Sequence, residues 1–186
     1  MPSFPGTLSL VGPGMYGTSF PGSPADGQVF ILVDSTTSPT YWWQFRYNAN
    51  SSSTYKWEFI GGAPIYANID TQESVTNTSY ADPTTPGPSI TVPRAGSYEI
   101  AHGAHAQCAA ANFAVVSPKL GAATPQLADG AFAYNASAAT EAAVSHTIIK
   151  TLAAADVVKL QYSSLSGSAV AYFRYRWLLI RPLRLS

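Results

Sequence analysis

Three histidines, His102, His105 and His146, are the side chains of this chain best suited to bind a metal ion or transfer a proton. His102 and His105 lie three positions apart in a segment that alternates like a β-strand, so they should point to opposite faces of a sheet. A zinc site needs several ligands that converge on one point, and no further ligand cluster accompanies this pair. We therefore expect no metal site and interpret the histidines as polar or interface residues.

The other residue types show no arrangement typical of a catalytic site. No nucleophile elbow, phosphate-binding loop or dinucleotide fingerprint occurs, and the acidic residues are scattered singly. The one cysteine, Cys108, lies in the small-residue run AQCAAA, and we interpret it as a small buried hydrophobic residue. We expect neither enzymatic activity nor a cofactor.

Charged residues are scarce in this chain. They make up 11% of the sequence, against about 25% in ordinary soluble domains, and ten basic residues balance ten acidic ones. So little charge is typical of a surface that is covered in an assembly. Nucleic-acid binding needs a concentrated positive face, so we expect no nucleic-acid partner. The only basic cluster, expected on one exposed face of the last strand, consists of Arg174, Arg176, Arg181 and Arg184.

Residues 1–27 are rich in proline and glycine, which suit neither a helix nor a central strand. We interpret them as an extended arm ordered by contact with a neighbour, the alternative being a disordered tail. The start of the chain lacks the charged region of a secretory signal, and no apolar stretch of about 18 residues occurs. We therefore expect synthesis in a cytoplasm without cleavage, and no membrane partner. The apolar residues that would dock the arm are Phe4, Leu8, Leu10, Val11, Met15, Tyr16 and Phe20.

Residues 28–65 predict a small antiparallel β module. Its segments are rich in aromatic and β-branched residues and are bounded by turn formers. Alternation places Trp43 on the opposite face from Trp42, and the simplest model pairs the aromatic faces of two neighbouring strands in a meander. The predicted strands are 28–34, 41–47 and 55–60.

The aromatic residues of this module have more than one interpretation. They could form the core of a small sheet, bind another subunit as interface anchors, or stack on sugars of a bacterial surface. We favour burial or interface, because aromatic residues dominate both. The residues concerned are Tyr41, Trp42, Trp43, Tyr55 and Trp57.

Beyond the hinge formed by Gly61, Gly62 and Pro64, short strands recur at intervals of roughly 8 to 15 residues, which predicts an antiparallel sandwich. Eight strands suit a jelly roll over residues 66–186, so the whole chain is predicted to be all-β. Two alanine-rich stretches, 136–145 and 152–158, could be helices, but we interpret both as strand and turn. The predicted strands are 74–80, 88–93, 96–107, 112–120, 129–135, 143–152, 156–164 and 168–183.

Three segments of residues 66–186 carry a resemblance. They are SITVPRAGSYEIAHGAHA at 89–106, LAAADVVKLQY at 152–162 and FRYRWLLIRPLRLS at 173–186. In this order they resemble the jelly-roll domains of trimeric viral proteins and, distantly, the C1q and tumour-necrosis-factor class. This resemblance implies a homotrimer.

A second resemblance rests on PADGQ, WWQFRYNA and YKWEFIGG, which are similar to a recurrent element of actinobacteriophage head or tail structural proteins. It implies a virion protein of a tailed phage. The matched residues are Asp26, Gly27, Gln28, Trp43, Arg46, Tyr47, Tyr55, Lys56, Trp57, Glu58, Phe59, Gly61 and Gly62.

Together the resemblances imply a trimeric capsid decoration protein that binds the major capsid protein on the virion surface and is made in the host bacterial cytoplasm. The alternative is a tail fibre or receptor-binding minor tail protein, which would contact tail proteins or a host surface glycan. If one histidine lay near a trimer axis, three copies of it would form a pH-sensitive cluster. The candidate contacts with the virion are Phe4, Leu8, Leu10, Met15, Tyr16, Phe20, Trp42, Trp43, Tyr55 and Trp57. The candidate trimer-interface residues are His102, His105, Phe113, Tyr172, Tyr175 and Trp177.

Overall fold

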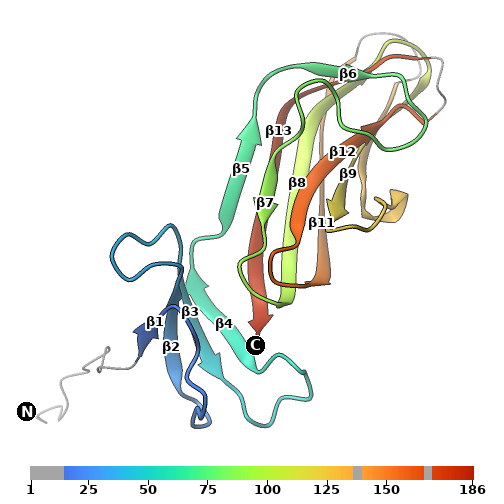
Figure 1. The fold of residues 1–186 in the computed structure, drawn as a ribbon. Helices are drawn as coiled ribbons and strands as arrows, with labels where there is room; N and C mark the ends of the chain where they lie inside the picture. The colour runs from blue at the N-terminus through green and yellow to red at the C-terminus, as the bar shows by residue number, and fades with distance from the viewer. Residues whose placement is uncertain (1–14, 136–139, 166–168) are drawn as a thin grey trace, which may run out of the picture. The chain divides into compact units, whose positions relative to one another are not determined.

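The computed structural model describes residues 15–135, 140–165 and 169–186, and within these ranges the regular structure is almost entirely strand (Figure 1). The chain divides between Ala63 and Pro64 into two compact units. Each unit has its own paired strands and its own buried side chains.

The first unit is a three-stranded antiparallel meander with a short parallel strand at one edge. The aromatic faces of β3 and β4 pair as expected, with Phe45 opposite Phe59 and Tyr47 opposite Trp57. Alternation also holds along β3, where Trp43 is buried and Trp42 is exposed. The strands are β1 (Tyr16–Gly17), β2 (Val29–Val33), β3 (Trp42–Tyr47) and β4 (Trp57–Gly62).

Residues 15–20 belong to this first unit. Ile31 donates its backbone N–H to the carbonyl of Met15 across 2.7 Å, and Phe20 stacks face to face on Trp57 with ring centres 4.4 Å apart. The ring of Phe20 also meets Phe45 edge to face at 5.3 Å. The end of the predicted arm is therefore part of the aromatic core of the small sheet, while residues 1–14 lie outside the described ranges.

The second unit is a jelly roll, as the strand spacing predicted. Its larger sheet has the order β11–β8–β13, and β5 and β6 both pair with the other side of β13. The smaller sheet has the order β10–β9–β12–β7. Along the chain, successive strands pass repeatedly from one sheet to the other, and Figure 1 shows the long strands β8 and β13 side by side in the larger sheet.

The strand bounds of the second unit agree with the predicted ones to within a few residues, apart from the first edge. That edge contains β5, which was not predicted, and β6 is shorter than the predicted strand at 74–80. The elements are β5 (Ile65–Ile69), β6 (Glu73–Val75), β7 (Ser89–Thr91), β8 (Gly96–Cys108), β9 (Asn112–Leu120), η1 (Leu127–Asp129), β10 (Ala131–Asn135), β11 (Ala142–Leu152), β12 (Val157–Ser163) and β13 (Ala171–Leu185).

Both alanine-rich stretches avoid helix where the structure describes them. Residues 142–152 form β11, and Ala153–Asp156 is the tight turn before β12, with Ala155 at a φ of 68°. The carboxylate of Asp156 closes this turn by accepting the backbone N–H of Ala153 across 2.8 Å. Tertiary pairing with β8 thus overrides the helix propensity of alanine. Residues 136–139 of the first stretch lie outside the described ranges.

Candidate interaction surface

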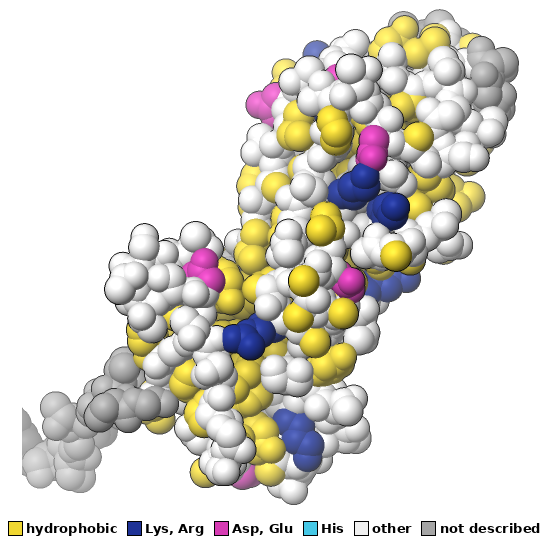
Figure 2. Space-filling model, in the orientation of Figure 1, with side chains coloured by type: hydrophobic (Ala, Val, Ile, Leu, Met, Phe, Trp, Pro, Cys, Tyr) yellow, Lys and Arg dark blue, Asp and Glu magenta, His cyan; other side chains and the backbone are white. Residues whose placement is uncertain are grey.

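The outward face of the larger sheet carries several large side chains that the fold leaves exposed. Tyr66 and Ile149 are 57% and 64% exposed, and Tyr175 is nearly half exposed. Residues directly opposite each other in neighbouring strands point to the same side of a sheet. Leu179 on β13 lies opposite Tyr66 on β5 and also opposite Ala101 on β8, so the register carries this outward face across the three strands. Figure 2, which views the molecule from the side on which β7 and β12 lie in front, shows few charged side chains among many hydrophobic and neutral polar ones.

A β-bulge in β13 gives this face its shape. The register against β8 shifts between Arg174 and Trp177, and Tyr175 has a φ of 48°, which is unusual for a bulky residue. The shift turns Tyr175 outward, where its ring meets His105 edge to face at 5.0 Å, and it turns Arg176 inward. Such a conformation costs about 1–3 kcal/mol, so the surrounding pairing must hold it.

Next to the bulge lies a cavity of about 350 Å³ that opens on the outward face, named here the sheet hollow. Its floor depends on Gly103, because a Cβ there would lie 2.4 Å from the carbonyl oxygen of Val144 and 2.9 Å from the ring of Trp177. Glycine therefore lets the indole lie directly over β8. The sheet hollow is lined by Tyr66, Asn68, Asp70, Ala104, His105, Ala143, Val144, Ser145, Tyr175 and Trp177.

The polar groups in and beside the sheet hollow have partners within the chain. Glu141 receives hydrogen bonds from the guanidinium of Arg174 and lies 3.0 Å from Nδ1 of His105. The hydrogen bonds from Arg174 hold the pKa of the Glu141 carboxyl below its usual range. On the other side, the Asn68 amide donates to the carboxylate of Asp70 across 3.1 Å. The sheet hollow thus presents aromatic rings and the hydrogen-bonded carboxylate of Asp70, with the Arg174–Glu141 ion pair beside it.

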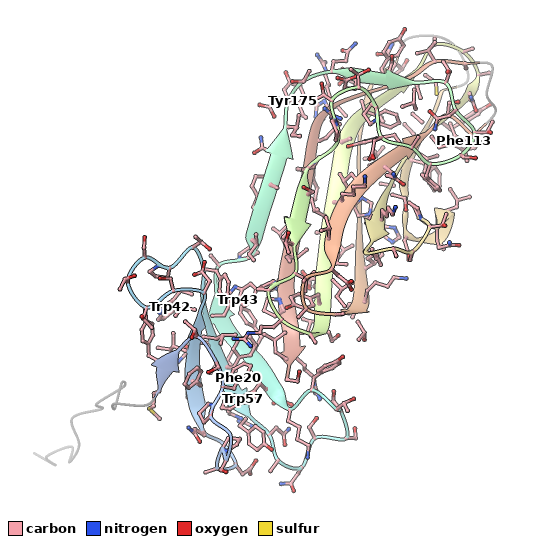
Figure 3. The ribbon with its side chains drawn as sticks, viewed as in Figure 1. Phe20, Trp42, Trp43, Trp57, Phe113 and Tyr175 are labelled. Atoms are coloured by element: carbon pink, nitrogen blue, oxygen red, sulfur yellow. The ribbon has the colours of Figure 1, made fainter. Side chains whose placement is uncertain are left out.

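A second exposed aromatic cluster, named here the aromatic ridge, lies on the outward face of the smaller sheet and consists of Phe113, Phe132 and Tyr134. Phe132 and Tyr134 are 55% and 58% exposed, and their rings lie 5.8 and 4.8 Å from that of Phe113. The pairing of β10 with β9 gathers them, since Tyr134 is directly opposite Phe113. In Figure 3, Phe113 and Tyr175 lie at the same end of the jelly roll.

His102 lies inside the jelly roll, which corrects its assignment to a trimer interface. As expected from their spacing, His102 and His105 point to opposite sides of β8, and His102 is the one that faces the core with no exposed surface. Its Nε2–H donates to the carbonyl of Asp129 across 2.9 Å, and its ring lies 6.2 Å from that of His146. Burial lowers the pKa of His102 to about 4.

The remaining candidates for a trimer interface do not form one surface. Four of them lie on the outward side of the larger sheet, whereas Phe113 belongs to the aromatic ridge of the smaller sheet. The exposed Tyr66 and Ile149 complete the first surface, and sequence reasoning missed both. A signal for Ile149 was present in the alternation of HTIIKT, but nothing marked Tyr66, because β5 was not recognised. The four residues are His105, Tyr172, Tyr175 and Trp177.

Two candidate virion contacts in the first unit are core residues. Trp43 has no exposed surface and donates its indole N–H to the carbonyl of Ala63, and Trp57 is buried beneath Phe20. Their rings fill the aromatic face of the meander, so they cannot contact a partner in this conformation. The candidates that retain exposed surface are Met15, Tyr16, Phe20, Trp42 and Tyr55, whereas Phe4, Leu8 and Leu10 lie outside the described ranges.

The basic residues of β13 do not share one exposed face, contrary to expectation. The bulge at Tyr175 reverses the alternation, so Arg174 stays outside and Arg176 becomes fully buried. The guanidinium of Arg176 donates to two backbone carbonyls and lies over the ring of Tyr162. Cys108, the single cysteine of the sequence, is buried, which confirms its interpretation as a small core residue.

Among the described residues, no group of three or more His, Cys, Asp and Glu side chains is placed to hold a metal ion. The described part of the chain also contains no helix with the length and apolar character needed to span a bilayer.

No family model and no curated protein matches the sequence. Among solved structures, the chain is similar to the Eiger TNF from S. frugiperda, with 10% identity over 67% of this chain and 95% of that one and a TM-score of 0.48. It is also similar to the globular domain of the zebrafish complement 1qA protein, with 13% identity over 65% of this chain and 98% of that one and a TM-score of 0.43. A third similar structure is the CBM36-1 domain of a multidomain xylanase from the hindgut metagenome of Trinervitermes trinervoides, with 14% identity over 62% of this chain and 95% of that one and a TM-score of 0.35.

Proposed function

We propose that the protein is a homotrimeric structural protein of a tailed-phage virion, bound as a capsid decoration protein to the major capsid shell. The observation that carries self-association is the outward face of the larger sheet, with exposed Tyr66, Ile149 and Tyr175 beside the sheet hollow. Covering one such side chain contributes about 1.5–3 kcal/mol, and aromatic residues are frequent interface anchors. The phage assignment is supported by the PADGQ, WWQFRYNA and YKWEFIGG segments.

The role is mechanical, and no covalent bond is made or broken. In this proposal the first unit and the segment before it contact the shell, through the exposed Trp42 and Tyr16 and through the apolar residues of 1–14. Each contact is modest, but a trimer presents three of them at once, which raises the overall affinity without new chemistry.

The proposal is tested first by the mass of the protein in solution and then by binding to shells that lack it. We expect a trimer by light scattering at micromolar concentration, and on the order of hundreds of copies per virion. Removal of residues 1–14 should weaken shell binding and leave the trimer intact, because the outward face of the larger sheet is unchanged. A monomer in solution would contradict the homotrimer. A truncated protein that binds shells as well as the full chain would contradict the role of residues 1–14 in shell binding.

A tail fibre or receptor-binding tail protein is the second candidate. It is favoured by the combination of Tyr66, Tyr175 and Trp177 with polar groups in one cavity, since aromatic rings and hydrogen-bonding side chains are the usual components of a saccharide site. A copy number equal to a small multiple of three, together with binding of the isolated protein to host cells, would support this candidate over shell decoration.

A further inference from the structure

We propose, on the basis of the homotrimer proposed above, that the aromatic ridge of each copy packs into the sheet hollow of the next copy around the ring. A cyclic trimer needs two different, complementary patches on every subunit, because each interface joins one patch to another. The jelly roll offers one patch that protrudes and one that is concave.

The aromatic ridge has the properties of the protruding partner. Phe132 and Tyr134 stand on β10, which is the edge strand of the smaller sheet, and more than half of each side chain is exposed. Phe113 supports both rings from β9. No charged side chain belongs to the aromatic ridge, so its burial leaves no ion without a partner.

The sheet hollow has the matching chemistry. Tyr175 and Trp177 offer ring edges and faces to an incoming aromatic side chain, and Tyr175 is held toward the opening by a left-handed backbone. The neighbouring cation of Arg174 is paired with Glu141, so covering the sheet hollow does not leave this cation without a partner. The carboxylate of Asp70 can accept a hydrogen bond from the hydroxyl of an incoming Tyr134.

The two patches also lie at the same height along the strands. His105, in the sheet hollow, comes shortly before the connection from β8 to β9, and Phe113 comes just after it. Figure 3 shows Phe113 and Tyr175 at this common end of the jelly roll. Rotation about an axis parallel to the strands preserves height, so only patches at one level can meet between neighbouring copies.

Cysteine cross-linking tests the pairing directly. In a chain with Cys108→Ser, the pair Asn68→Cys and Tyr134→Cys would join each copy to the next under mild oxidation. We expect a covalent trimer on a denaturing gel, while either cysteine alone should give no product larger than a dimer. Circular dichroism of each variant checks that the fold is retained.

Charge insertion gives an independent measurement. Phe132→Asp should convert the trimer to a monomer at the same concentration, whereas Val157→Asp, at an exposed position on β12 outside both patches, should leave the mass unchanged.

The outcomes separate this inference from the proposed homotrimer. A wild-type trimer that gives no cross-link and tolerates Phe132→Asp would overturn the pairing and leave the homotrimer standing. A wild-type monomer would overturn the homotrimer. Loss of cell binding in a Phe132→Asp variant that stays trimeric would overturn the pairing and instead assign the aromatic ridge to a saccharide.

Discussion

The Nε2–H of His102 donates a hydrogen bond to the backbone carbonyl of Asp129 across 2.9 Å inside the jelly roll. A carbonyl can only accept, so this bond fixes the neutral tautomer with its proton on Nε2. The other ring nitrogen, Nδ1, is buried and has no partner in the described structure. Protonation of Nδ1 would place a charge in the core, and burial, followed by the nearby ring of His146, is what lowers the pKa of His102 to about 4.

We expect the protein to lose stability as the pH falls from about 7 to about 4. The unfolded chain binds a proton on His102 near its ordinary pKa of about 6.5, whereas the folded chain resists it until about pH 4, so lower pH favours unfolding. A shift of this size corresponds to about 3 kcal/mol. Denaturant unfolding at both pH values and one protein concentration measures it.

The matched variants for this prediction are His102→Gln and His105→Gln. Glutamine can place an amide N–H where Nε2 of His102 lies and does not titrate, so His102→Gln should reduce the loss of stability at low pH. His105 is on the outward face, and its replacement should preserve most of that loss. An unchanged pH dependence in His102→Gln would contradict the assignment, because the loss of stability would then come from groups other than His102.

The stacking of Phe20 on Trp57 predicts that replacing Phe20 by a smaller residue lowers the stability of the first unit. Phe20→Ala removes a ring that contacts Phe30 and Phe45 as well, and we expect a loss of about 2–4 kcal/mol in the stability of the first unit. Urea unfolding followed by tryptophan fluorescence measures it. Trp42→Ala, at a residue that is 49% exposed, should cost less than about 1 kcal/mol. Equal effects of the two substitutions would show that Phe20 is not part of this core.

Much of the strand pattern could be predicted because alternation and turn residues are local signals. The aromatic pairing of β3 with β4 and the opposite orientation of His102 and His105 both follow from a period of two. The period alone does not say which of the two histidines faces the core. That depends on the segment between β9 and β10, in which Asp129 and Gly130 supply the carbonyls for His102 and His146.

The features that sequence reasoning missed are produced by long-range pairing. A bulge has no reliable local signature, so the inward turn of Arg176 could not be read from a strand that appears to alternate regularly. The strand β5 follows directly after the Gly61–Gly62–Pro64 hinge and is defined by its pairing with β13, more than a hundred residues away. Both misses lie at the sheet hollow, where Tyr66 and Tyr175 come together.

The close contacts around Gly103 predict that a methyl group added at this position destabilises the protein. In Gly103→Ala the new Cβ would meet the backbone oxygen of Val144 at 2.4 Å, so β11 or Trp177 must move, at a cost of about 1–3 kcal/mol. Thermal unfolding and the near-ultraviolet dichroism of the indole should both change. Gly61→Ala is the control, because its Cβ would come no closer than 3.5 Å to any atom and should change stability by about 0.5 kcal/mol at most. A stable Gly103→Ala variant with an unchanged indole spectrum would contradict this role.

The contacts of Arg176 predict that the planar shape of its buried guanidinium contributes to stability as well as its positive charge. Its two terminal nitrogens donate to the carbonyls of Thr71 and Thr85 across 3.1 and 3.0 Å, and within the described chain no carboxylate pairs with it. The single ammonium of Arg176→Lys cannot reproduce this fork, so we expect a loss of about 1–3 kcal/mol in denaturant unfolding and faster amide exchange in residues 71–85. Arg174→Lys keeps an exposed ion pair with Glu141 and should cost less than about 1 kcal/mol. If both substitutions had the same small effect, the buried guanidinium would not be what joins these two loops to β13.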